Sequence, residues 1–537
     1  MKGMVVCTEP RAAEEGSKIL ARGGNAVDAA VTAAFVQSIV NPTECGVGGF
    51  GTMNIYQART GKCVILDFQG RAGAKVTPEM WQDRIISLSA DTYLLKDNVN
   101  MLGHTSVTTP GTVSGLYQSL TEYGTKNWQE VIETAISYAE NGVPVDTRTA
   151  ALSYQLMPAG FPTHEKIMKC TPGSRKLWYK EDGSPYSSGE LRVNKDYART
   201  LRRIMDEGPD SVYTGSIARE IIEDMEKHGG FITASDLKDY QTATYTPIRS
   251  TYRGYELLTN RPPGCGVTLL QLLNIIEGYP LAGMQTDSVE YNWLLVQAMR
   301  AANADRVQYL GDIEFADVPV EMLISKERGE CWRKKIDAGE RIVVSKTQLV
   351  PRTSTTHLCA IDEVGNCVSF THSNGSNSGC VTPGLGFIHN NSMVLFYAMP
   401  GLPNSIASGK ARVTGMSPTM IFKDGRLVMA IGASGGFAIM SAVAQSIINV
   451  IDHGMSIGEA VSSPRVHCEG GLIELEGRIR AGVAEELRLK GNPVYHWTDG
   501  FARRMAQVHG INIELLTQEW KGGADPRGNG GIAWSHA

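Results

Sequence analysis

The sequence lacks the features that mark several common classes of protein. Its ten cysteines include no CxxC pair and no zinc-site spacing, and no uninterrupted apolar run reaches the ~18 residues that a membrane span needs. Lysine and arginine are scattered and form no basic tail, and a net charge of -5 gives no general attraction to nucleic acid. We therefore expect no metal site, no membrane span and no nucleic-acid partner.

Two further absences bear on the cell compartment. The cysteines are scattered singly, which is typical of a reducing compartment. No apolar stretch of signal-peptide length follows Lys2. The sequence therefore predicts a cytoplasmic protein, with the earlier removal of an export signal left open.

The chain contains neither an internal repeat nor a low-complexity segment, and 42% of its 537 residues are hydrophobic. A chain of this length can bury a large core without disulfides or metals. The apolar periodicity is helical over residues 14–40, through most of residues 110–350 and again over 438–452. Short strands are predicted at 52–56, 63–67, 357–361, 368–371, 418–422 and 427–431. This mixture predicts an α+β or layered α/β/α protein.

A glycine-rich segment, GVGGFG at residues 46–51, fits the pattern GxGxxG. A dinucleotide site needs a strand before this pattern and a helix after it. Here helix-like sequence comes first and strand-like sequence follows. The segment therefore predicts a tight backbone turn that requires glycine, and no cofactor.

A second motif, GASGG at residues 432–436, fits GxSxG around Ser434. It follows an apolar strand and precedes a helix, which is the context of a serine nucleophile elbow. A serine hydrolase would also need an acid and a downstream histidine, and the strand order before the motif is not that of a doubly wound sheet. The other interpretation is a glycine-rich turn whose amides bind a ligand. Five histidines downstream satisfy the order: His453, His467, His496, His509 and His536.

A third motif is the threonine pair Thr355-Thr356 at the start of a predicted strand. β-Branched residues favour strands in any case, so the pair alone indicates little about chemistry. The threonine pair becomes informative because it belongs to an ordered series of motifs. Along nearly its whole length, the chain resembles the gamma-glutamyltransferase family of N-terminal-nucleophile (Ntn) hydrolases. The motifs that carry the resemblance are GGNAVDAA (23–30), the glycine-rich turn (45–51), TPG (109–111), GVPV (142–145), YRGY (252–255), PPG (262–264), TTH (355–357) with Asp362 and Gly365-Asn366, MSPT (416–419), GASGG (432–436) and ADPR (524–527).

The resemblance implies an Ntn-hydrolase αββα sandwich of two antiparallel sheets between helical layers. It also implies self-cleavage, in which the Thr355 hydroxyl attacks the carbonyl of Ser354. The products would be a large subunit, 1–354, and a small catalytic subunit, 355–537, which share one domain. A dimer of such heterodimers is left open. The freed α-amine of Thr355 has a reference pKa of about 7.7–8.0, so nucleophile and base would lie on one residue.

The resemblance assigns the remaining catalytic roles residue by residue. Ser373 would orient the nucleophile. The amides of Thr414-Gly415, where the family has two serines, would stabilise the oxyanion. Gly435 and Gly436 would turn their amides to the substrate. The substrate would be a small acyl or amide compound.

Three positions depart from the family pattern for binding a gamma-glutamyl group. Gln69 stands where the family has an arginine for the α-carboxylate, with Arg71 two residues on. Val394-Leu395 stands where an aspartate holds the α-ammonium, and Gly375 replaces an asparagine. A charged head group without partners would cost several kcal/mol to bury. The sequence therefore predicts a non-standard acyl substrate. The alternatives are a true gamma-glutamyltransferase, a homologue that cleaves a C–C bond, a serine hydrolase using Ser434, and a non-catalytic scaffold.

Overall fold

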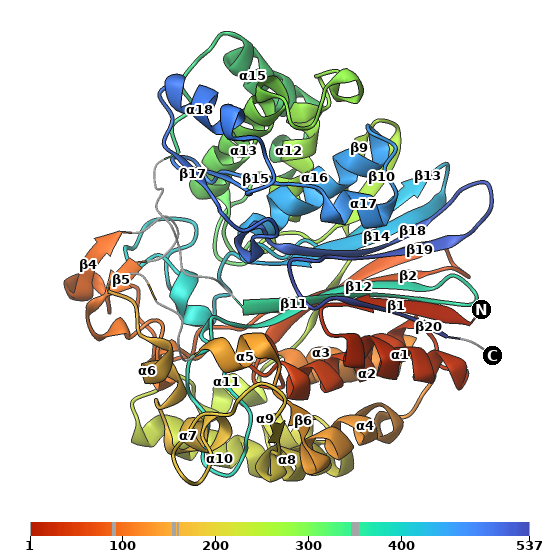
Figure 1. The fold of residues 1–537 in the computed structure, drawn as a ribbon. Helices are drawn as coiled ribbons and strands as arrows, with labels where there is room; N and C mark the ends of the chain where they lie inside the picture. The colour runs from red at the N-terminus through yellow and green to blue at the C-terminus, as the bar shows by residue number, and fades with distance from the viewer. Residues whose placement is uncertain (1, 89–92, 153–156, 158–159, 345–353, 536–537) are drawn as a thin grey trace.

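Two antiparallel sheets stack face to face between two layers of helices in the computed structural model, which describes residues 2–88, 93–152, 157, 160–344 and 354–535 (Figure 1). The predicted αββα sandwich is therefore confirmed. The first sheet runs β20 (Gly531–Ser535), β1 (Gly3–Cys7), β11 (Ser354–Asp362), β12 (Cys367–Gly375), β2 (Phe50–Gln57), β3 (Lys62–Phe68) and β8 (Ala243–Tyr245). The second runs β19 (Trp520–Ala524), β18 (Gln507–Ile513), β14 (Arg426–Ser434), β13 (Thr419–Lys423), β10 (Tyr255–Thr259) and β9 (Ile248–Tyr252).

The helices divide between the two outer faces (Figure 1). One layer covers the first sheet and includes α1 (Pro10–Ala21), α2 (Ala26–Val40), α3 (Thr112–Tyr123), α4 (Trp128–Asn141), α8 (Lys195–Glu207) and α10 (Ser216–Lys227). The other covers the second sheet and includes α12 (Gly266–Ile276), α13 (Val289–Tyr309), α15 (Lys326–Asp337), α16 (Ala438–Ile451), α17 (Ile457–Ser462) and α18 (Ala481–Leu489). None of these described helices combines the length and apolarity of a membrane span.

Strand β11 shows why the sheets stack as they do. Successive side chains of a strand point to opposite faces. Leu358 and Ala360 pack into the core beneath the first helical layer, whereas Cys359 and Ile361 pack between the sheets. Both faces of the strand are thus apolar, which forces the sheet to be covered on both sides. By the same alternation, Thr355 belongs to the face between the sheets.

The GGNAVDAA motif builds the start of α2, the helix behind the centre of the first sheet. The Asn25 side chain accepts hydrogen bonds from the Val27 and Asp28 amides, and Asp28 accepts one from the Asn25 amide. This capping box satisfies amides that the first turn would otherwise leave without partners. The Ala26 amide donates to Asp362 Oδ2 at 3.1 Å, which ties the helix start to the end of β11.

The predicted strands are present, and several are longer than predicted. The region predicted as mostly helical, 110–350, also supplies the strands β8, β9 and β10 to the two sheets. Residues 357–361 extend to Ser354–Asp362, and 427–431 extend to Arg426–Ser434. The predicted helix 438–452 is Ala438–Ile451. Ser354 therefore starts a central strand, while residues 345–353, just before the predicted cleavage point, lie outside the described residues. The predicted division of the chain into segments 1–354 and 355–537 stays a prediction.

Candidate active site

Thr355 lies at an irregularity in the pairing of β11 with β12. Ser354 pairs with Gly375 and Thr356 pairs with His372, so Thr355 alone faces two residues of β12, Ser373 and Asn374. Such bulges are frequent next to active sites because they re-aim a side chain. The Thr355 hydroxyl lies 3.1 Å from the Ser373 hydroxyl, and the threonine is 4% exposed. The predicted nucleophile and its predicted orienting residue are thus in contact.

The backbone nitrogen of Thr355 faces a carboxylate that the sequence reasoning missed. It donates to Glu44 Oε2 at 2.9 Å. The other oxygen, Oε1, is held by Arg148 at 2.7 Å and also by Arg503. Arg148 comes from α5 (Thr147–Ala151) and Arg503 from η7 (Arg503–Met505). One local signal pointed to Glu44, because it is the only charged residue in segment 41–51.

The glycine-rich turn, residues 46–51, lies directly against β12. A Cβ on Gly49 would lie 2.5 Å from the Ser373 carbonyl oxygen, and one on Gly51 would lie 2.7 Å from that of Thr371. The Asn374 amide donates to the Glu44 carbonyl at 2.8 Å. These glycines therefore allow the close backbone approach that brings Glu44 to Thr355. The turn follows α2 and its last two residues begin β2, as predicted for a structural turn.

The second glycine-rich motif ends β14 on the facing sheet. Gly432 packs against the His357 ring, where an added Cβ would lie 2.3 Å from Cε1, so β14 runs over β11. Ala430 belongs to the same apolar cluster as Cys359 and Ile361, so β14 and β11 run in opposite directions, and the end of β14 at Gly435 lies over the Thr355 end of β11. Gly435 and Gly436 have φ of 135° and 62°, conformations that residues with a side chain rarely adopt.

Ser434 itself has no catalytic surroundings. Its hydroxyl is buried and has no hydrogen-bond partner among the described residues. Opposite it in β18 stands Gln507, which is not a base. A serine nucleophile needs a base within hydrogen-bond reach. The motif is therefore a turn at the end of β14, and ligand binding by its amides stays a prediction.

The Thr414 amide is already engaged, contrary to its predicted role at the oxyanion. It donates to the Pro263 carbonyl at 2.9 Å, beside the bridge between Gly264 and Thr414. Gly415 packs on Gly436, where an added Cβ would lie 2.0 Å from the Gly436 oxygen. The segment thus lies beside the end of β14, but the Thr414 amide is used for holding it there.

The side chains of Gln69 and Arg71 lie in different surroundings. The Gln69 amide is buried and lies 3.3 Å from Asp67 Oδ1 and 3.7 Å from Met416 Sδ. Burial raises the pKa of Asp67 to about 7, although the hydrogen bond from Gln69 opposes that shift.

Arg71 Nη1 pairs with Glu314 at 3.0 Å and lies 3.6 Å from Asp312. It lines a cavity of about 390 Å³ to which neither Thr355 nor Ser373 contributes. Arg71 therefore does not fit its predicted role for an anionic substrate end, because two acids already neutralise it.

The remaining predicted binding residues surround the end of β12. The Gly375 amide donates to the Ser373 hydroxyl at 2.9 Å, and a Cβ on Gly375 would lie 2.2 Å from Asn391 Oδ1. Val394 and Leu395 follow in η6 (Ser392–Leu395) and are buried in the apolar core. No charged group replaces the family aspartate at these two positions.

One group of described residues has the composition of a metal site. Ligand atoms of His104, Asp224 and Cys380 lie within 4.8 Å of one another. His104 Nε2 lies 3.1 Å from Asp224 Oδ2, to which Thr382 donates at 2.7 Å. Burial raises the pKa of the Cys380 thiol well above its usual value.

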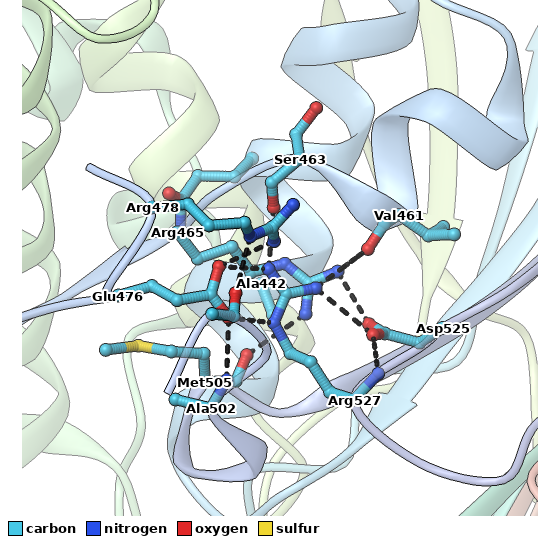
Figure 2. A network of polar contacts seen from close by, with 12 residues as sticks. Ala442, Val461, Ser463, Arg465, Glu476, Arg478, Ala502, Met505, Asp525 and Arg527 are labelled. Atoms are coloured by element: carbon cyan, nitrogen blue, oxygen red, sulfur yellow. Dashed lines mark hydrogen bonds and ion pairs between the residues drawn. The ribbon is translucent and has the colours of Figure 1, made fainter. Parts of the chain in front are cut away.

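A buried network of charged side chains holds the turn that carries Arg503 (Figure 2). Arg465 donates to the carbonyls of Met505 and Ala506 at 3.1 and 3.0 Å and pairs with Asp525 at 2.7 Å. Burial raises the pKa of Asp525, but the guanidinium groups of Arg465 and Arg527 outweigh that effect and hold it below its usual value.

The network's second carboxylate holds the start of the same turn. Both oxygens of Glu476 accept hydrogen bonds from Arg527, each at 2.6 Å, and one also accepts from the Ala502 amide at 2.9 Å. Ala506, at the end of the turn, packs on Gly435. The ADPR motif therefore fixes the segment that borders both Glu44 and the end of β14.

Comparison with known proteins gives matches over nearly the whole chain. The family model described as gamma-glutamyltranspeptidase matches residues 12–535. The acylase ACY 1 proenzyme of Pseudomonas sp. (strain V22) is 36% identical over 510 residues, which cover 92% of this chain and 87% of that protein. The glutathione hydrolase proenzyme of Bacillus subtilis (strain 168) is 31% identical over 552 residues, covering 98% of this chain and 90% of that protein.

The fold has a close match among solved structures. The crystal structure of cephalosporin acylase from Bacillus halodurans has a TM-score of 0.88 and 27% sequence identity, and the match covers 100% of this chain and 96% of that chain. The similarity thus includes relatives named for acylase activity and relatives named for glutathione hydrolysis.

Proposed function

The chain belongs to the gamma-glutamyltranspeptidase family of self-processing hydrolases and transferases, and from this premise we propose that it is an acylase with Thr355 as its nucleophile. The observation that carries the proposal is the contact of the Thr355 hydroxyl with Ser373 at 3.1 Å and of its nitrogen with Glu44 at 2.9 Å. Nucleophile, orienting hydroxyl and carboxylate thus meet at one residue, at the start of a central strand.

Self-cleavage comes first. The Thr355 hydroxyl attacks the Ser354 carbonyl, the C–N bond breaks as the new C–O ester bond forms, and the nitrogen takes the proton. The α-amine of Thr355 is free once the C–N bond has broken, and water then hydrolyses the ester, which releases the Ser354 carboxylate and restores the Thr355 hydroxyl. An amide nitrogen is not a base, so the hydroxyl gains its own proton acceptor only after this cleavage.

Acyl transfer follows on the mature protein. The hydroxyl attacks a substrate amide while the amine accepts its proton and passes it to the leaving amine. Water or another amine then releases the acyl group. We assign the oxyanion to the amides at Gly435-Gly436 in place of that of Thr414, which is engaged with Pro263. One such donor contributes on the order of 3–4 kcal/mol.

Glu44 acts as a positioning residue for the amine. Arg148 and Arg503 occupy one of its oxygens, which aims the other at the Thr355 nitrogen. A carboxylate in this place stabilises the ammonium that forms when the amine takes the hydroxyl proton. Its role resembles that of the acid that orients a catalytic histidine.

Glu44→Gln is expected to lower kcat/KM by about 10- to 100-fold, since it keeps the shape and removes the charge. The carboxylate raises the pKa of the amine, so its removal shifts the acid limb of the kcat/KM–pH profile to lower pH. Glu44→Asp is the matched control, because it retains the charge and should leave that limb in place. A fall in rate without movement of the limb would assign Glu44 a structural role only.

The acyl group is expected to lack an α-ammonium, because Val394 and Leu395 offer no carboxylate. The test compares kcat/KM for gamma-glutamyl anilide with that for glutaryl anilide, which differs only in the missing amine. We expect glutaryl anilide to be preferred by at least about tenfold, the cost of desolvating an unpaired ammonium. Equal turnover of the two, with free glutamate released, would make the chain an ordinary gamma-glutamyl enzyme.

A further inference from the structure

Arg412 is a buried cation close to the proposed nucleophile. Its Nε donates to the Ser392 hydroxyl and its Nη1 to the Val413 carbonyl, both at 3.0 Å. Its guanidinium carbon lies 5.1 Å from the centre of the Phe50 ring. Among the described residues, no carboxylate contacts the guanidinium and its Nη2 has no hydrogen-bond partner. Buried charges are normally paired with a charge of opposite sign, so this guanidinium is suited to bind an anionic ligand.

The sheet register places Arg412 over the same face as Thr355. Phe50 in β2 pairs with Ser373 in β12, and paired residues point to the same face. Ser373 in turn touches Thr355 in β11. Neighbouring strands are about 4.8 Å apart, so two spacings put the backbones of Phe50 and Thr355 roughly 10 Å apart. A ligand of a few carbon atoms can therefore span from the nucleophile to the guanidinium.

Two more contacts connect Arg412 to the site. The segment that begins at Arg412 reaches Gly415, which packs on Gly436 at the end of β14. Gln69, the residue in the place of the family arginine, lies 3.7 Å from Met416 Sδ in the same segment. The positive charge that the family has at the position of Gln69 is absent there, and Arg412 carries one on a neighbouring segment. Burial lowers the pKa of Arg412 to about 9, which leaves it protonated at neutral pH.

We propose that Arg412 binds the terminal carboxylate of the acyl group, so that the substrates are amides of dicarboxylic acids. This rests on the proposed function of Thr355. A guanidinium pairs with a carboxylate through parallel N–H donors, which gives both charge and direction. Phe50 supports one face of the guanidinium, and Ser392 and Val413 fix its orientation. Arg71 is excluded from the role because Glu314 and Asp312 occupy it.

The experiment measures kcat/KM for glutaryl anilide and for pentanoyl anilide, in which a methyl group replaces the carboxylate. Arg412→Gln is expected to lower the glutaryl-to-pentanoyl ratio by about 10- to 100-fold, and Arg412→Lys should restore part of it. Arg71→Gln is the matched control and should leave the ratio unchanged. A ratio that Arg412→Gln leaves at the wild-type value, or that Arg71→Gln lowers equally, would overturn the proposal.

A binding measurement separates this proposal from that of the nucleophile. Calorimetric titration with glutarate needs no turnover, and glutarate should bind about 10- to 100-fold more weakly to Arg412→Gln than to wild type. If neither anilide is hydrolysed but this difference in binding is found, the acylase proposal fails and the Arg412 site stands. Equal binding of glutarate by wild type, Arg412→Gln and Arg412→Lys would refute the site even if the enzyme is an acylase.

Discussion

Thr355→Ala is expected to remain a single chain of 537 residues and to lose acylase turnover by about 10⁴-fold or more. The substitution removes the hydroxyl that would attack both the Ser354 carbonyl and the substrate. Without cleavage, the residue-355 nitrogen stays an amide and cannot accept a proton. Intact mass spectrometry reports the cleavage, and anilide hydrolysis reports the turnover.

Two variants serve as controls for Thr355→Ala. Thr355→Ser keeps a hydroxyl at the same atom and should still yield segments 1–354 and 355–537. Ser434→Ala removes the serine of the GxSxG motif, whose hydroxyl has no partner among the described residues, and should cleave and turn over normally. Cleavage at the same bond in Thr355→Ala, or loss of activity in Ser434→Ala alone, would show that Thr355 is not the nucleophile.

The parts of the fold that were predictable have local causes. The capping box of Asn25 and Asp28 involves residues three apart, so its sequence pattern is sufficient. The alternation along residues 357–361 likewise depends on the two faces of a single strand. The pairing of β1 with β11 joins residues more than 350 positions apart, and apolar periodicity contains no information on it. Only the family resemblance supplied the stacking of the two sheets.

The contact between Thr355 and Ser373 could be anticipated from the sequence, whereas the charged groups around it could not. Arg148 and Arg503, which are 104 and 459 residues away in the chain, hold the Glu44 carboxylate in position. Sequence spacing could not bring these three together. Arg71 failed in its predicted role for the same reason, because Glu314 neutralises it from 243 residues away. Electrostatic roles depend on which charges meet in space, and that is set by tertiary packing.

Ion pairs and hydrogen bonds connect the buried network of Figure 2 to Glu44. Asp525 and Glu476 hold Arg465 and Arg527, and Arg465 and Glu476 bind the backbone from Ala502 to Ala506. That turn delivers Arg503 to Glu44. The network therefore helps to fix the position of the carboxylate that faces the Thr355 nitrogen. A substitution in the network, far from the substrate, can thus lower both stability and turnover.

Asp525→Asn is expected to lower the free energy of unfolding by about 3–5 kcal/mol, because it leaves Arg465 and Arg527 buried with one negative charge fewer. Urea unfolding of the processed protein measures the change. Glu256→Gln is the matched control: it breaks the exposed pair with Arg249, whose side chains are 42% and 63% exposed, and should cost no more than about 1 kcal/mol.

The pH dependence of the Asp525→Asn effect follows from the lowered pKa of Asp525. A carboxylate of lowered pKa stabilises the fold above its unfolded pKa, about 3.9, and this contribution is lost as the pH falls through the folded value. The difference between wild type and Asp525→Asn should therefore be full at pH 6–7 and shrink below about pH 4. A cost no larger than that of Glu256→Gln, or one that grows as the pH falls, would show that the network in Figure 2 does not stabilise the fold through this charge.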